Sequence, residues 1–162
     1  MALLCARHLP AATVYGADIS TKAVRFARMN ARSYSISNVR FVRGDLFEPL
    51  PRKLAKHVDL VCAHPPYVAR GEVRHVRREM RYEPPEAITD SSKDGLGLIG
   101  RIVREAPMWL AGGGWLLIQV VGFRARPVAA VLREAGFSQV RHLRPEGEYD
   151  RVIVGRLMDA TH

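Results

Sequence analysis

The sequence is poor in the features that define several other classes of protein. It has only two cysteines, Cys5 and Cys62, and neither lies in a Cys-x-x-Cys motif or at a metal-ligand spacing from a histidine. Their surroundings are apolar, so we expect buried thiols in a reducing cytosol and no metal site. No apolar run approaches membrane-spanning length, and the start at 1–9 is too short and polar for a signal peptide. These absences favour a cytoplasmic protein with no membrane partner.

Acidic residues are also few relative to basic ones. The 162 residues include 25 Lys and Arg against 16 Asp and Glu, which gives a net charge of +9. This excess favours an anionic partner such as ribosomal or other nucleic acid, although an arginine-rich proteome would produce the same balance. Hydrophobic content of 48% is ordinary for a globular protein. We therefore predict one domain over residues 1–162, with a core of its own.

The hydrophobic pattern alternates between helix and strand. Such alternation predicts an α/β fold with a mostly parallel sheet, and the last two strands are expected to form an antiparallel hairpin. Ser20 is the expected N-cap of the second helix, and Gly136 the expected C-terminal stop of the last one. An irregular helix or loop is expected at 70–81, and a turn at 111–114. We expect helices at 2–9, 21–33, 97–110 and 127–135, and strands at 13–17, 39–42, 58–63, 115–121, 137–143 and 151–157.

One strand ends in an unusual way. The apolar run 58–63 stops at His64-Pro65-Pro66-Tyr67. The run is expected to be buried on both faces, because it is continuously apolar rather than alternating. The two prolines cannot extend the ladder and fix φ, and a residue before a proline is pushed toward an extended conformation. The pattern predicts a rigid elbow at the carboxyl end of a parallel strand, where α/β sheets bind ligands.

Acidic residues end the two preceding strands. Asp18 follows the strand 13–17, and Asp45, with Leu46 after it, follows the strand 39–42. Alone, either aspartate could be a turn residue or a helix cap. Together with the elbow, however, they form an ordered set in which each member ends a successive strand. The set predicts a ligand site along one edge of the sheet.

This set resembles the class I S-adenosylmethionine-dependent methyltransferases that modify planar amino groups, in which the elbow reads Asn-Pro-Pro-Tyr. Other segments resemble the HemK-type glutamine methyltransferases of peptide-chain release factors, so the resemblance covers nearly the whole chain. It implies a Rossmann-like, doubly wound, mostly parallel sheet with a carboxyl-terminal antiparallel hairpin. The additional matching segments are Tyr82–Ile88, Asp94-Gly95-Leu96, Ala106-Pro107, Gly113–Ile118, Asp150-Arg151-Val152 and Gly155-Arg156.

The resemblance also implies a role for each site residue. S-adenosylmethionine would be the methyl donor, with Asp18 on its ribose and Asp45 and Leu46 at its adenine. A glutamine side-chain amide of a protein, such as a release factor, would be the acceptor. His64 and the Pro65 carbonyl would accept its two N–H groups and aim the nitrogen at the methyl group. Pro66 and Tyr67 complete the substrate-binding motif, and the tyrosine ring would pack on the flat acceptor.

The chain departs from the family in two respects. His64 stands where the family has Asn, and no Gly-x-Gly segment precedes Asp18. The family's first, central strand and its Gly-rich loop are therefore expected to be absent, as in an amino-terminally truncated chain. That loop wraps the methionyl part of the cofactor, so we expect cofactor binding to be weakened or lost. The strands ending at Asp18 and Ala63 would lack their common neighbour.

Two alternative functions stay open at this point. The positive charge favours methylation of an amino group on a nucleic-acid base, whereas the two departures favour a non-catalytic remnant or binding module. A basic stripe after the elbow could contact phosphates or could be a solvated face. Glu72 and Glu79 interrupt the stripe and favour the solvated face through local pairing. The stripe consists of Arg70, Arg74, His75, Arg77, Arg78 and Arg81.

Overall fold

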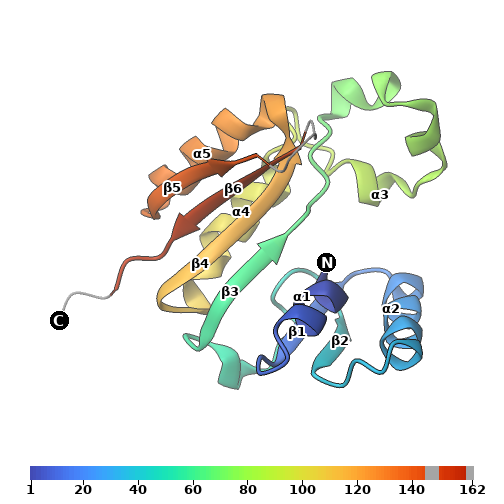
Figure 1. Ribbon diagram of the computed structural model, residues 1–162. Helices are drawn as coiled ribbons and strands as arrows, with labels where there is room; N and C mark the ends of the chain where they lie inside the picture. The colour runs from blue at the N-terminus through green and yellow to red at the C-terminus, as the bar shows by residue number, and fades with distance from the viewer. Residues whose placement is uncertain (145–149, 160–162) are drawn as a thin grey trace. The chain divides into compact units, whose positions relative to one another are not determined.

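The computed structural model describes residues 1–144 and 150–159 (Figure 1). The chain divides into two compact units, residues 1–54 and residues 55–162, and each is described by itself. Helices and strands alternate in both units, as the sequence predicts. Two parallel and two antiparallel strand pairs make up the strand pairing of the described residues.

The first unit holds a two-stranded parallel sheet with two helices. β1 pairs with β2 in register, from Val14 opposite Val39 to Asp18 opposite Arg43. Ser20 Oγ accepts a hydrogen bond from the Ala23 N–H at 3.2 Å, which confirms the expected N-cap of the second helix. The elements are α1 (Ala2–His8), β1 (Val14–Asp18), α2 (Thr21–Ser33), β2 (Val39–Arg43) and the 3₁₀ turn η1 (Arg52–Leu54).

The second unit is built on a four-stranded sheet in the order β3-β4-β6-β5. β3 and β4 are parallel, while β6 runs antiparallel to both of its neighbours, so the expected carboxyl-terminal hairpin is confirmed. Its core lies between the sheet and helices α4 and α5, where Ile99, Leu116, Ile118, Leu132 and Ile153 are fully buried. The strands are β3 (Val58–Ala63), β4 (Leu110–Val121), β5 (Ser138–Leu143) and β6 (Asp150–Arg156). The helices are α3 (Pro85–Ile88), α4 (Gly97–Glu105) and α5 (Ala125–Glu134), with 3₁₀ turns η2 (Arg70–His75), η3 (Arg78–Tyr82), η4 (Ala106–Met108) and η5 (Gly122–Arg124).

The boundary between α4 and β4 differs from the expectation. The helix ends at Glu105 and continues only as η4, where Pro107 has no N–H to donate. The expected turn at 111–114 lies inside β4, because Leu110 already pairs with Val58 before the register shifts. A Cβ at Gly114 would lie 3.1 Å from the Val58 carbonyl oxygen, so glycine lets the two strands approach there.

The expectation that β3 is buried on both faces is wrong. Asp59 and Leu60 are exposed, and Leu60 is 40% accessible. β3 is exposed because it is the end strand of its sheet: within the described residues it pairs with β4 alone, and β1 likewise pairs only with β2. Among the described residues, each of these two strands therefore has one edge with which no other strand pairs.

The structure also bears on the cysteines and on membrane-spanning segments. Neither Cys5 nor Cys62 forms a disulfide, and both are partly accessible rather than buried: Cys5 lies on α1 beside the exposed Leu4, and Cys62 lies on β3. Among the described residues, no helix is both long and apolar enough to cross a membrane.

Candidate active site

The first unit brings three predicted site residues to one edge of its sheet. Asp18 ends β1, and Asp45 and Leu46 follow β2. The Gly44 N–H donates to the Asp18 carbonyl oxygen at 3.1 Å, so the two strand ends lie side by side. Because β1 and β2 are parallel, this is their shared carboxyl edge, where α/β sheets bind ligands.

The local conformation at this edge is suited to contact with a ligand. Asp18 is exposed, and its Oδ1 accepts the Ser20 N–H at 2.8 Å, while Oδ2 accepts no hydrogen bond from the described residues. Leu46 has φ of 46°, a left-handed conformation that costs a non-glycine residue roughly 1–2 kcal/mol. Strain of this kind concentrates at functional sites. The edge therefore offers one carboxylate oxygen, a second partly buried carboxylate at Asp45 and an apolar side chain.

The elbow follows β3 in the second unit and presents two rings. His64 is exposed, Pro65 is buried, and Pro66 and Tyr67 are half-buried. The imidazole and phenol ring centroids are 6.0 Å apart, with their planes tilted by 49°. A small flat group could contact both rings at once. These four residues belong to a different unit from Asp18, Asp45 and Leu46, so the two sets are described separately.

The loop that precedes α4 contacts the backbone of the elbow and of the residues directly after it. The Val68 N–H donates to the Ile88 carbonyl oxygen at 3.1 Å, and the Arg70 N–H donates to the Ser92 carbonyl oxygen at 2.9 Å. Gly95 has φ of 70°, and a Cβ there would lie only 2.1 Å from the Tyr67 carbonyl oxygen. Glycine is therefore required twice, for its left-handed backbone and for the close approach to the elbow.

Asp90 organises that loop. Its Oδ1 accepts from the Ser92 N–H at 2.9 Å and from Ser92 Oγ at 2.6 Å, and its Oδ2 accepts from the Leu98 N–H at 2.6 Å. The last bond satisfies a backbone donor in the first turn of α4, which has no side-chain cap of its own. Partial burial raises the pKa of Asp90, but hydrogen bonds from Ser92 and Leu98 together outweigh it and hold the pKa below its usual value.

An ion pair fixes the segment that leaves the elbow. Glu72 Oε2 accepts from the Ala69 N–H at 3.0 Å and pairs with Arg124, 52 residues away in the sequence. Arg124 ends η5, directly after β4, and its guanidinium carbon lies 4.9 Å from the centroid of the Phe123 ring. The expectation that Glu72 pairs locally is wrong, because its carboxylate reaches the carboxyl end of β4 instead.

Sequence reasoning missed these supporting residues as parts of the site. The Asp94-Gly95 dipeptide is a turn signal and could have indicated the left-handed backbone at Gly95. The pairing of Glu72 with Arg124 has no local signal, because no periodicity connects residues so far apart.

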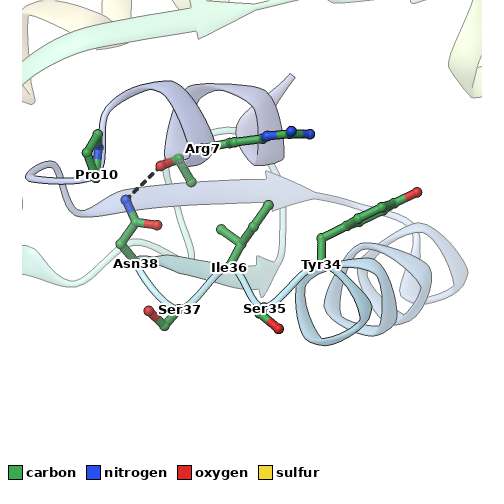
Figure 2. Close-up of a pocket in the computed structure, with 8 residues that line it drawn as sticks. Arg7, Pro10, Tyr34, Ser35, Ile36, Ser37 and Asn38 are labelled. Carbon is green, nitrogen blue, oxygen red and sulfur yellow. Dashed lines mark hydrogen bonds between the residues drawn. The ribbon is translucent and has the colours of Figure 1, made fainter.

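The structure also has a cavity of about 460 Å³ in the first unit, which Figure 2 shows. It lies before the amino ends of β1 and β2, at the opposite end of these strands from Asp18 and Asp45. Asn38 Nδ2 donates to three backbone carbonyl oxygens, at 3.0 to 3.1 Å, and so joins the end of α1 to the start of β2. The cavity is therefore not the expected cofactor site. Its lining residues are Ala6, Arg7, Pro10 and Tyr34 to Asn38.

The class of protein follows from comparison with known families. A family model described as a methyltransferase domain matches residues 2–119, which is most of the chain. The chain belongs to this methyltransferase domain family.

The curated relatives include release factor glutamine methyltransferases and a methyltransferase named for a different substrate. The chain is 34% identical over 143 residues to the release factor glutamine methyltransferase of Yersinia pestis, covering 88% of this chain and 50% of the relative. It is 36% identical over 159 residues to that of Neisseria gonorrhoeae, covering 98% and 57%. It is also 38% identical over 136 residues to a 4-amino-L-phenylalanine/4-methylamino-L-phenylalanine methyltransferase of Streptomyces pristinaespiralis, covering 84% and 45%. The chain thus spans about half the length of these relatives.

Solved structures agree on the fold. A methyltransferase from Pyrococcus furiosus superposes with a TM-score of 0.67 at 16% identity, covering 96% of this chain and 68% of that one. The methyltransferase SibL in its apo form gives 0.66 at 19% identity, covering 97% and 47%. The expected Rossmann-like methyltransferase fold is confirmed.

Proposed function

We propose that this chain carries the catalytic part of a HemK-like, S-adenosylmethionine-dependent methyltransferase whose acceptor is a glutamine side-chain amide of a protein. The observation that carries the proposal is the elbow, in which an exposed imidazole and a tyrosine ring stand together at the carboxyl end of a parallel strand. The relatives named as release factor glutamine methyltransferases suggest a peptide-chain release factor as that protein. Such an acceptor places the reaction in the cytoplasm.

The acceptor nitrogen needs help from the protein, because its lone pair is delocalised into the carbonyl group. His64 and the Pro65 carbonyl would accept the two N–H bonds and orient the nitrogen, while the Tyr67 ring would pack on the amide plane. Methyl transfer would form the N–C bond as the bond between the methyl carbon and the donor sulfur breaks, and one N–H proton would pass to solvent. A neutral imidazole has one acceptor nitrogen, whereas the amide oxygen of an asparagine has two lone pairs. We therefore expect slower transfer than an asparagine at this position would give.

The carboxyl edge of β1 and β2 is suited to the adenosine part of the donor. Asp18 has a carboxylate oxygen that no described residue engages, and it would accept hydrogen bonds from the ribose hydroxyls. Asp45 would accept from the adenine amino group, and Leu46 would lie against the ring. S-adenosylmethionine would supply the electrophilic methyl group when bound. Asp18, Asp45 and Leu46 would contact only the adenosine part of the donor, so we expect binding to be weak.

One observation favours a second candidate. The excess of basic residues, 25 against 16 acidic, suits a nucleic-acid or ribosomal partner and hence an amino group on a base as acceptor. A non-catalytic remnant with the methyltransferase fold is the third reading, favoured by His64.

The test is a direct search for the methylated product. The purified protein is incubated with S-adenosylmethionine and either a release factor or ribosomal RNA, and each acceptor is digested and analysed by mass spectrometry. We expect one added methyl group on a glutamine of the release factor, and its loss with Tyr67→Ala. Methylation of RNA alone would favour the second candidate, and no product on either acceptor would favour the remnant.

A further inference from the structure

The elbow and η5 follow neighbouring strands. β3 and β4 are parallel, and Ala63 pairs with Ile118, so the elbow lies beside the last residues of β4 (Figure 1). β4 passes directly into η5, and η5 passes into α5, whose first residue, Ala125, is buried. Arg124, the last residue of η5, is therefore attached to a well-packed connection between a strand and a helix.

Two hydrogen bonds connect Arg124 to the elbow. Arg124 Nη2 donates to Glu72 Oε2, and the same oxygen accepts from the Ala69 N–H at 3.0 Å. Ala69 is two residues beyond Tyr67, and both Ala69 and the intervening Val68 are buried. Few free torsion angles remain between Ala69 and β3, because the two prolines of the elbow fix φ. A displacement of Ala69 should therefore also move Tyr67.

The surroundings of Arg124 suit a geometric role better than a stabilising one. Its side chain is 12% exposed, and its guanidinium carbon lies 4.9 Å from the centroid of the Phe123 ring. Its Nε is buried and has no hydrogen-bond partner among the described residues. An unsatisfied buried donor costs free energy, and apolar side chains of similar size often stabilise a protein as well as a buried ion pair does. An ion pair does, however, restrict the orientation of the two segments that it joins.

We propose that Arg124 is a positioning residue for the acceptor site. It holds the Glu72 carboxylate where that group accepts the Ala69 N–H, without touching the acceptor itself. The Tyr67 ring thereby keeps its place relative to His64. This inference rests on the proposed function, in which His64 orients the acceptor amide and the Tyr67 ring packs on it. It adds the requirement that η5 stay connected to the elbow during methyl transfer.

The test separates the ion pair from the hydrogen bond that it supports. Arg124→Leu removes the pair and keeps an apolar side chain in its place, whereas Arg124→Lys keeps the positive charge. The exchange Glu72→Arg/Arg124→Glu restores an ion pair, but the arginine that it introduces has no acceptor atom for the Ala69 N–H. The control is Arg101→Leu, which removes the same charge from the more exposed pair with Glu105 on α4.

Two measurements are made under conditions in which urea titration shows each variant to be folded. NMR records the nuclear Overhauser cross-peak between the rings of His64 and Tyr67, whose centroids are 6.0 Å apart. Methyl transfer from S-adenosylmethionine to a purified release factor gives kcat and KM for the acceptor. A residue that only stabilises the fold would change neither the cross-peak nor kcat under these conditions.

We expect Arg124→Leu to weaken the cross-peak and to lower kcat by roughly tenfold, with a smaller change in KM, because small displacements near reacting groups slow a reaction strongly. Arg124→Lys should largely restore both, and Arg101→Leu should match the unmodified protein. The exchange variant should resemble Arg124→Leu. Recovery of kcat in the exchange variant would overturn the proposal, and so would an unchanged cross-peak or an unchanged kcat in Arg124→Leu. If the exchange variant does not fold, the leucine and lysine variants decide.

Failure of the proposed function gives a different result. If the unmodified protein methylates no release factor, the proposed function is wrong and the cross-peak alone decides the role of Arg124. A cross-peak that is lost in Arg124→Leu and present in Arg124→Lys supports the positioning role, and any other pattern overturns it.

Discussion

Replacement of Gly95 by alanine should disturb the elbow, although Gly95 itself is not proposed to contact a ligand. A Cβ at this position would lie 2.1 Å from the Tyr67 carbonyl oxygen and 3.1 Å from the Ala69 nitrogen. Contacts between such atoms need roughly 3 Å or more, so the elbow and the loop must separate by about 1 Å. A misplacement of about 1 Å near reacting groups can lower a rate by about a hundredfold.

The stability of the chain should also fall. Alanine at φ of 70° costs about 1–2 kcal/mol of backbone strain, and the steric overlap with backbone atoms adds to this. We expect a loss of roughly 2–4 kcal/mol in the free energy of unfolding, measured by urea titration.

A matched control separates the two effects. Gly136 has φ of 84°, yet a Cβ there would meet no heavy atom within 4 Å. Gly136→Ala should therefore show only the backbone strain, about 1–2 kcal/mol, with methyl transfer or acceptor binding unchanged. If Gly95→Ala and Gly136→Ala behave alike in both measurements, the close approach to Tyr67 does not support the elbow and the reasoning fails.

Three further predictions test other parts of the site. Asp90→Asn should lower the free energy of unfolding by about 1 kcal/mol at neutral pH, because an amide cannot accept both sets of N–H donors. The pKa of Asp90 is lowered in the folded state, so its carboxylate contributes fully to the free energy of unfolding above the unfolded pKa, about 3.9. This contribution is lost as pH falls through the folded-state pKa. The unmodified protein and Asp90→Asn should therefore become equally stable in urea titrations at acid pH. Glu72→Gln should lower the free energy of unfolding by about 1–2 kcal/mol, because the largely buried Arg124 guanidinium then lacks its carboxylate partner. Glu79→Gln, on the exposed surface, should have little effect. Equal melting temperatures for the two variants would contradict this. Asp18→Asn should weaken binding of S-adenosylmethionine in calorimetry with an unchanged melting temperature, and unchanged binding would remove Asp18 from the cofactor site.

The features that the sequence predicted well depend on local chemistry. Ser20 caps α2 because its hydroxyl lies next to the free N–H groups of the helix start. Gly136 ends α5 in the left-handed conformation that glycine adopts readily. The parallel pairing of β1 with β2 followed from the strand–helix–strand order. In each case neighbours along the chain determine the structure.

The features that the sequence did not predict depend on distant neighbours. The exposure of Leu60 follows from the free edge of β3, which the residues of β3 do not encode. The contact of Gly95 with Tyr67 and the pairing of Glu72 with Arg124 join segments far apart in the sequence. Motif matching found the elbow itself but not the residues that hold it in place.

Methyl transfer to a release factor by elbow variants tests most directly whether the elbow holds a flat acceptor amide. Transfer of labelled methyl groups from S-adenosylmethionine is measured for the unmodified protein and for His64→Asn and Tyr67→Ala. We predict faster transfer with His64→Asn, because the asparagine amide oxygen has two lone pairs for the acceptor N–H group, whereas the imidazole ring has at most one acceptor nitrogen. We predict strongly reduced transfer with Tyr67→Ala. Equal rates for all three proteins would contradict the account of the elbow.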